Sequence, residues 1–243
     1  MNQLSIQQVL GANSYPGRGI LFGRSADGLF AVIVYFLTGR SENSRNRIFA
    51  VEGQNLRTRP FDPAKVSDPS LILYAPVRAL EGATVVTNGD QTDTICDYLA
   101  QGRTFEEALR TRTFEPDAPN FTPRISGLME TGRGLRYRLS IVKSGDAEGK
   151  TVQRFFYEYE APQAGAGRLI QTYQGDGDPL PAFEGEPVRV AVEGDIDAFS
   201  HAVWDSLDAE NKISLFVRFI NLKTGLTETR VFNKNLCTKN EEN

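Results

Sequence analysis

The feature that most constrains the fold is a series of short apolar runs separated by turn residues. Residues 29–37 form the longest run and are rich in β-branched and aromatic side chains, which favours a buried central strand. The run is too short to cross a bilayer as a helix. Together with residues 19–23 and the Ser-Ala-Asp-Gly turn signal at 25–28, it predicts an antiparallel hairpin.

Strand-like runs continue on both sides of a helical middle segment. The further predicted strands are 48–51, 71–74, 83–87, 124–128, 135–143, 152–159, 169–173, 213–222 and 226–232. The predicted helices are 92–101, 104–113 and 195–207. The second of these helices opens on a Thr104–Glu107 capping box, and three prolines predict a connecting loop over 56–69.

Two adjacent helices after a run of strands favour the α+β class over a βαβ repeat. We therefore expect two mainly antiparallel sheets packed face to face, with the helices outside. There is no internal repeat and no clear linker, so residues 1–243 are expected to form one domain. Its polar end, 238–243, is expected to be frayed.

The charge balance bears on which ligands the chain could bind. The net charge is −4 and no basic run stands out, which argues against nucleic acid as a partner. Seven of the 27 basic residues are Lys and twenty are Arg. Guanidinium groups form forked bonds to phosphate, so a local pocket for a small anion is one explanation. A composition bias of the genome explains the arginines equally well.

Cysteine and histidine are scarce, which narrows the possible chemistry. The two cysteines, Cys96 and Cys237, are not spaced as a metal-binding or redox pair, so we expect reduced thiols and no cysteine metal site. Residues 1–10 lack the features of a signal peptide, so we expect a cytoplasmic protein. His201 is the single histidine and lies in a predicted amphipathic helix. A surface or packing role is more common there than catalysis, so chemistry is expected from carboxylates, Tyr, Arg, amides and backbone donors.

The strongest local signal is the strand–turn–helix passage 85–95. Asn88-Gly89 makes a tight turn, and the free N–H groups of a helix start favour an anion or a polarised oxygen. Asn88 can both donate to and accept from a carboxamide or a purine edge, and Asp93 can accept from an amide or hold an arginine. The same residues also fit a simple turn and a helix capped by Thr92 or Asp93.

Three other segments carry candidate side chains. Arg40, Ser41, Arg45 and Arg47 could clamp a phosphate, although a solvated loop has the same composition. Residues 120–125 could aim Thr122 and Arg124 into a site, because Pro123 fixes the chain at the start of a strand. A plain strand start is the alternative.

The last candidate is Tyr74, whose phenol could donate to a developing oxyanion at a strand end. A half-buried packing residue is the alternative. Two common nucleotide motifs are missing from the sequence, the G-x-x-x-x-G-K-[ST] phosphate loop and a G-x-G-x-x-G between a strand and a helix. Residues 15–19 are glycine-rich but lead into a strand.

In combination, these segments resemble the archaeal-type, single-domain IMP cyclohydrolase family, over about residues 15 to 130. The matching residues, in chain order, are Tyr15-x-Gly17-Arg18, Gly23-Arg24, Arg40-Ser41 with Arg45, Tyr74, Thr84-Val85-Val86-Thr87-Asn88-Gly89-x-x-Thr92-Asp93-Thr94-Ile95 and Thr122-Pro123-Arg124-Ile125. Asp90-Gln91 stands where some relatives have a Ser-His pair, so a histidine role there is lost.

The resemblance implies a four-layer αββα fold like that of N-terminal nucleophile hydrolases. It also implies ring closure of 5-formamidoimidazole-4-carboxamide ribotide to IMP and water, the last step of purine biosynthesis, without metal or cofactor. The chain begins Met1-Asn2, without the nucleophile of such hydrolases. Cyclohydrolases of this type are not expected to need one.

The resemblance also implies roles for the candidate residues. As catalytic residues it suggests Tyr74, Asn88, Asp93 and Arg124, and as substrate-binding residues Arg40, Ser41, Arg45, Gly89, Thr92 and Thr122. Exposed sheet edges and the family analogy favour a homo-oligomer. Two alternatives remain: a non-catalytic relative that binds or senses a purine nucleotide, and an amidohydrolase processed to expose a nucleophile such as Ser5.

Overall fold

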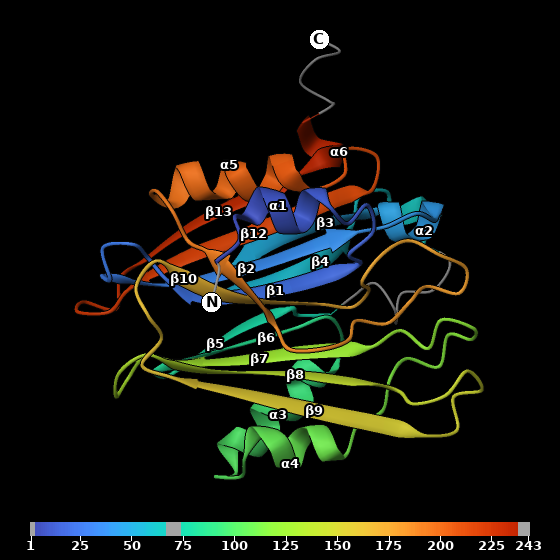
Figure 1. Ribbon diagram of the computed structural model, residues 1–243, viewed down its shortest axis with the longest axis horizontal. Coiled ribbons are helices and arrows are strands. Elements are labelled where there is room, and N and C mark those ends of the chain that lie inside the picture. Colours follow the sequence, from blue (N-terminus) through green and yellow to red (C-terminus); the bar gives the residue numbers. More distant parts are fainter. Residues whose placement is uncertain (1–2, 67–73, 238–243) are drawn as a thin grey trace.

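Two antiparallel sheets packed face to face form the centre of the computed structural model, which describes residues 3–66 and 74–237 (Figure 1). The six-stranded sheet has the order β11 (Val188–Ala191), β10 (Ala166–Gln171), β1 (Arg18–Arg24), β2 (Phe30–Thr38), β12 (Lys212–Asn221), β13 (Thr227–Asn233). The seven-stranded sheet has the order β3 (Arg47–Glu52), β4 (Asn55–Pro60), β5 (Val77–Leu80), β6 (Ala83–Thr87), β7 (Arg124–Glu130), β8 (Arg136–Ser144), β9 (Val152–Glu160).

Helices cover the outer face of each sheet and complete four layers (Figure 1). Helices α1 (Ile6–Gly11) and α5 (Ile196–Ser206) pack on the six-stranded sheet, and α3 (Gln91–Ala100) and α4 (Phe105–Arg110) on the seven-stranded sheet. One-turn helices α2 (Glu42–Arg45) and α6 (Lys234–Cys237) and a 3₁₀ turn at Pro63–Lys65 lie in connections. The predicted α+β sandwich is confirmed, and its likeness to N-terminal nucleophile hydrolases stays a prediction.

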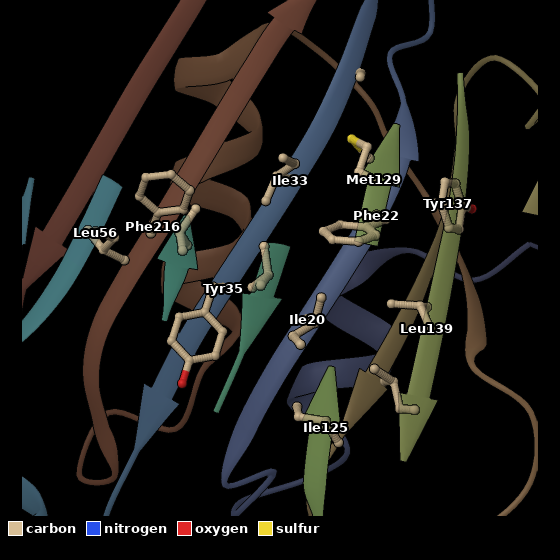
Figure 2. Packing of buried hydrophobic residues seen from close by; sticks show 14 of the residues in the cluster. Ile20, Phe22, Ile33, Tyr35, Leu56, Ile125, Met129, Tyr137, Leu139 and Phe216 are labelled. Atoms are coloured by element: carbon tan, nitrogen blue, oxygen red, sulfur yellow. The ribbon is translucent and has the colours of Figure 1, made fainter. Parts of the chain in front are cut away.

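Strand β2 shows why the longest apolar run has no polar face. Ile33 and Tyr35 belong to the core between the sheets, whereas Val34 and Phe36 belong to the core under α1 and α5. Side chains alternate along a strand, so a strand covered on both faces is apolar throughout. Figure 2 shows the inter-sheet core, which includes Phe22 and Phe216 of one sheet and Leu56 and Met129 of the other; Phe22 lies near Met129, and Phe216 near Leu56.

Several sequence predictions need correction or fall outside the described residues. The predicted loop at 56–69 is wrong in its first part, because β4 runs through it with Leu56 and Thr58 buried on alternate positions. Helix α1 and strands β5 and β11 were not predicted, since each is short. The predicted strand at 71–74 lies outside the described residues except for Tyr74, and so does the tail at 238–243. Within the described residues no helix is both long and apolar enough to span a membrane.

Candidate active site

Two adjoining cavities, of about 340 and 350 Å³, form a cleft where β1 and β7 begin and β6 ends. They share the residues Arg18, Asp117 and Thr122. We call one the carboxylate cavity; it is further lined by Tyr74, Asn88, Gly89, Asp90, Glu115 and Pro116. The other is the arginine cavity, further lined by Tyr15, Arg40, Ser41, Asn43, Ser44, Arg47, Asn120, Tyr173 and Leu180.

The arginine cavity holds two inward-lying cations without a counter-ion. Arg47 is 2% exposed, and its Nε donates to the Ser44 carbonyl at 2.8 Å. Arg18 begins β1, and its Nε is buried with no hydrogen-bond partner. Across 3–66 and 74–237, neither guanidinium has a carboxylate within ion-pair distance. Arg40, by contrast, pairs with Asp176 and lies over the Tyr15 ring, with its Cζ 4.8 Å from the ring centroid.

This arrangement gives the cavity a concentration of positive charge that suits an anion. Burial and the neighbouring charge of Arg18 lower the pKa of Arg47 to about 10, so it stays a cation at neutral pH. Burying an unpaired charge costs free energy, and two like charges add to that cost. A phosphate between them would supply the missing acceptor oxygens through charge-assisted hydrogen bonds.

The carboxylate cavity is backed by an arginine that is ion-paired through one nitrogen, Nη1, while its Nε is buried without a hydrogen-bond partner. Arg124, 8% exposed at the start of β7, places Nη1 at 2.7 Å from an Asp90 oxygen and at 2.7 Å from Gln91 Oε1. The same nitrogen is 2.9 Å from Glu115 Oε1, and Arg112 pairs with the second oxygen of Asp90. One guanidinium therefore holds together the turn after β6 and the segment before β7.

The two carboxylates on Arg124 have opposite pKa shifts. Burial raises the pKa of Glu115 above its ordinary value, against the opposing charge of Arg124. Partial burial also raises the pKa of Asp90, but hydrogen bonds and charges from Arg112 and Arg124 outweigh it and leave that pKa below its ordinary value. When neighbouring acids are pushed apart in this way, the one with the raised pKa is the better proton carrier. Glu115 is that residue here.

Position 89 requires glycine because the side chains bonded to Arg124 lie close to its backbone. A Cβ atom there would lie 2.7 Å from Gln91 Oε1 and 2.8 Å from Arg124 Nη1. Contacts below 3.0 Å cannot be accommodated without moving the paired groups. A side chain at position 89 would therefore displace the arginine that positions Glu115.

Asn88 and Thr92 brace the turn from inside. Asn88 Oδ1 accepts from Gln91 Nε2 and from the Ile125 N–H, each at 2.9 Å, and its Nδ2 donates to the Pro123 carbonyl at 2.8 Å. The Thr92 hydroxyl donates to the Gly89 carbonyl at 3.0 Å. The alternative of a helix capped by Thr92 or Asp93 is wrong, because the N-cap is Asp90 and no side chain caps it.

Hydroxyl groups line the remaining walls. The Tyr74 hydroxyl, in a side chain 8% exposed, lies 2.9 Å from the hydroxyl of the fully buried Tyr35. At the junction of the two cavities, the Thr122 hydroxyl donates to Asp117 and lies 2.6 Å from the Tyr173 hydroxyl. The Thr122 N–H donates to the other Asp117 oxygen at 2.7 Å, so Asp117 is held facing the junction.

The structure brings most of the predicted site residues together. Those lining the cleft are Arg40, Ser41, Tyr74, Asn88, Gly89 and Thr122, while Thr92 and Arg124 lie directly behind its wall. Asp93 does not line the cleft; its side chain is 69% exposed and pairs with Arg78 at 2.9 Å. Arg45 does not line it either, because it is exposed and its Nε donates to the Gly39 carbonyl at 3.2 Å.

Among the charged residues of the cleft, Arg18, Glu115 and Asp117 were not predicted as site residues. Arg47 was considered as part of a phosphate clamp but was not assigned a role. Arg18 lies in a segment that matches the family pattern, and Arg47 lies in a segment that carries other predicted residues. Only the folded structure shows that Arg47 lines the cleft and Arg45 does not. Glu115 and Asp117 lie between α4 and β7, in a segment without periodic pattern. His201 is exposed on α5 and packs against the Phe232 ring, which confirms the predicted surface role.

Comparison with known proteins adds an independent line of evidence. Residues 15–225 match the model of the family described as IMP cyclohydrolase-like protein, well beyond the 15–130 expected from the motifs. The chain is 32% identical to an IMP cyclohydrolase of Methanopyrus kandleri over 181 residues, which are 70% of this chain and 89% of that protein. It is 31% identical to IMP cyclohydrolases of Methanosphaera stadtmanae and Methanothrix thermoacetophila, over 61% and 55% of this chain and 76% and 71% of theirs.

Proposed function

Because the chain belongs to the IMP cyclohydrolase-like family, we propose that it closes 5-formamidoimidazole-4-carboxamide ribotide to IMP with release of water. The observation that carries the proposal is the two-part cleft. Unpaired arginines lie at one end, and a carboxylate with a raised pKa lies at the other. The two ends suit the phosphate and the reacting amides of one ribotide.

The phosphate binds in the arginine cavity between Arg18 and Arg47, with Arg40 and Ser41 at its mouth. The support is the lack of any ion pair at Arg18 and Arg47 and the unpartnered Nε of Arg18. The geometry favours Arg47 over Arg45 for this role, because Arg47 is buried in the wall and Arg45 is exposed outside it. Phosphate binding at this end fixes the register of the substrate.

The ribose lies at the junction, beside Asp117 and Thr122, since it joins the phosphate to the ring. Both Asp117 oxygens already accept from Thr122, and each retains a lone pair for a sugar hydroxyl. Such a site would discriminate strongly against a sugar lacking that hydroxyl, because the carboxylate would lose its donor.

The reacting groups lie in the carboxylate cavity beside Glu115 and Tyr74. The carboxamide nitrogen attacks the formyl carbon, one of its protons leaves, and the formyl oxygen becomes a hydroxyl. The formamide nitrogen then loses its proton as the hydroxyl departs as water, which leaves the new ring with its carbon–nitrogen double bond. Glu115 in its ionised form accepts the carboxamide proton and delivers it to the formyl oxygen, which becomes the hydroxyl. It then accepts the formamide proton and delivers it to the departing hydroxyl, so both protons leave in the water.

Tyr74 stabilises the oxygen that gains charge in this sequence. Its hydroxyl can donate to the formyl oxygen while accepting from Tyr35 behind it. Asn88 has one amide hydrogen left for the carboxamide, because its other polar bonds brace the turn. A cytoplasmic location and a purine ribonucleotide as ligand are part of this proposal.

Absorbance assays with the purified chain test the proposal. Wild type is expected to accelerate conversion of the formamido ribotide to IMP, and Glu115→Gln to lose at least about 100-fold in kcat while still binding IMP by calorimetry. Arg110→Gln on the exposed side of α4 serves as the matched control. Wild type that binds IMP but does not accelerate closure would overturn the enzyme and support a nucleotide sensor. Wild type that does neither would overturn both.

A further inference from the structure

A third cavity, of about 330 Å³, lies between the two sheets at the end remote from the cleft; we call it the distal cavity. Strands β8 and β9 line it on one side and β10 and β11 on the other, with the connection 161–163 as its end wall. Gly167 in its wall pairs with Gly23, which lies five residues along β1 from Arg18, about 17 Å in a strand. The distal cavity is therefore separate from the candidate active site.

Two arginines of the distal cavity face each other across neighbouring strands. Arg168 of β10 and Arg189 of β11 are directly opposite in the antiparallel register. Arg168 alternates with Leu169 and Arg189 with Val190, whose side chains belong to the core under α1 and α5, so both arginines lie on the inner face of their sheet. Like charges in this position repel each other.

The hydrogen bonds of these arginines go to neutral groups. Arg168 Nη1 donates to the Pro187 carbonyl at 3.2 Å, and Arg189 Nη2 donates to Gln163 Oε1 at 2.6 Å. Within residues 3–66 and 74–237, no carboxylate is within ion-pair distance of either guanidinium. The repulsion between the two cations is thus not offset by an acid of the described chain.

The glutamates near the distal cavity are directed elsewhere. Tyr159 packs against the inter-sheet core, so strand alternation turns Glu158 and Glu160 to the helix side of β9. On that side Glu158 pairs with Arg138 at 3.0 Å. Glu186, in the segment before β11, is exposed and has no ion pair with a described residue. The charges that face the distal cavity from its strands are therefore both positive.

Two tyrosines of the other sheet complete the wall. Arg168 lies over the Tyr159 ring with its Cζ 5.0 Å from the ring centroid, and the centroids of Tyr137 and Tyr159 are 5.0 Å apart. Tyr137 is 2% exposed, and neither tyrosine hydroxyl has a hydrogen-bond partner in the part of the chain that the structure describes. A covered hydroxyl without a partner costs free energy. The distal cavity therefore offers several donors to an acceptor from outside.

We propose that the distal cavity binds a phosphate group, either free or as the monoester of a small sugar. The two guanidinium groups donate forked hydrogen bonds to a tetrahedral oxyanion, and the two phenols donate to its remaining oxygens. The anion offsets the repulsion between Arg168 and Arg189. The volume is close to the 350 Å³ of the arginine cavity, which leaves room for a sugar beside the phosphate. This site does not rest on the proposed ring closure.

Calorimetry with ribose 5-phosphate tests the site in an Arg47→Met background, which removes a buried donor from the cleft. One ligand should bind per chain, and Arg168→Gln and Arg189→Gln should each raise the dissociation constant at least about tenfold, because the phosphate loses a charged donor. Tyr137→Phe should raise it about threefold, through loss of a neutral donor. Arg133→Gln is the matched control, because Arg133 is exposed between β7 and β8 and outside the distal cavity. Circular dichroism checks that each variant is folded.

Hydrogen exchange of wild type locates the ligand without a variant. Ribose 5-phosphate should slow exchange in residues 161–168. Titration with inorganic phosphate identifies the source of the group: tighter binding of ribose 5-phosphate supports a sugar monoester, and equal binding supports free phosphate. No binding at millimolar ligand, binding that both arginine variants retain, or slowed exchange confined to the cleft would each overturn the proposal. None of these readouts depends on ring closure or on IMP.

Discussion

Arg47 and Arg124 are both almost fully buried at the same cleft, yet they have opposite surroundings. Arg124 donates through one nitrogen to an Asp90 oxygen and to Gln91, each at 2.7 Å, and the same nitrogen is ion-paired with Glu115 at 2.9 Å. Arg47 has one backbone carbonyl at 2.8 Å and a second cation, Arg18, nearby. Arg124 therefore binds groups of the protein itself, whereas Arg47 has no anionic group of the described chain as a partner.

The difference teaches how to tell a binding cation from a positioning cation. Removing a buried charge that has good partners lowers the stability of the fold strongly, because its partners stay buried and unpaired. A buried charge without a partner destabilises the fold, and a bound anion that pairs with it would offset that cost. Substitutions at the two positions should therefore act on different quantities.

The largest effect is expected from Arg47→Met. Binding of IMP should weaken by about 100-fold, the upper range for a charged hydrogen bond, because the phosphate loses a buried donor. The free energy of unfolding should stay the same or rise, since an unpaired charge is removed. Calorimetry and urea denaturation measure the two quantities. Arg45→Met, two residues away but exposed, is the control, and equal losses in both variants would remove the distinction.

Arg124→Met should show the reverse pattern. The free energy of unfolding should fall by about 2 kcal/mol, less than for a fully buried pair because Asp90 is 59% exposed on its side chain. IMP binding should weaken less than tenfold, because Arg124 lies behind the wall. Urea denaturation and calorimetry again provide the readouts. Unchanged stability would mean that the network contributes nothing to the fold.

The pH dependence should sharpen the comparison of Glu115 with Asp90. The folded pKa of Glu115 is raised above its ordinary 4.5, so its stabilising contribution is complete below 4.5 and is lost as pH rises through the folded value. Turnover should change in the opposite direction, because the ionised form is the base, and should fall as pH drops through the same value. In Arg124→Met this acid limb should move to higher pH. A limb that stays in place would argue against Glu115.

The smallest effect is expected from Asp93→Asn. Its side chain is mostly exposed and pairs with Arg78 outside the cleft, and exposed ion pairs contribute little. Turnover should change by less than about twofold. Steady-state assays beside Glu115→Gln would establish the contrast. A loss comparable to that of Glu115→Gln would place Asp93 in the catalytic machinery after all.

Much of the fold could be predicted because many elements are marked by residues close together in the sequence. The run at 29–37 predicted β2, and the Thr104–Glu107 capping box begins α4 as predicted. Strand β4 was missed because three prolines in 56–69 outweighed the alternation of Leu56 and Thr58. A proline at the end of a strand does not exclude that strand, and local composition cannot reveal that Pro60 lies at the end of β4.

In the candidate site, too, residues marked by a local sequence pattern were predicted and residues placed by tertiary contacts were missed. The turn at Asn88-Gly89 was found because a strand, a bend and a helix succeed one another in the chain. Glu115 and Asp117 were missed because they lie in an irregular segment whose path depends on tertiary contacts, including Phe121 at a positive φ of 42°. Arg45 ends the helical turn α2, whereas Arg47 begins strand β3. Which of the two enters the cleft wall is fixed only when both sheets are assembled.

The two unpaired arginines come from different sheets, Arg18 from the first residue of β1 and Arg47 from the first residue of β3. Any small tetrahedral anion that reaches them therefore relieves a repulsion between the two halves of the sandwich. Phosphate and sulfate in ordinary laboratory buffers should compete with the ribotide and raise the melting temperature as they bind. Apparent substrate affinity would then depend on the choice of buffer, and a nucleoside without its phosphate would gain nothing from this part of the protein.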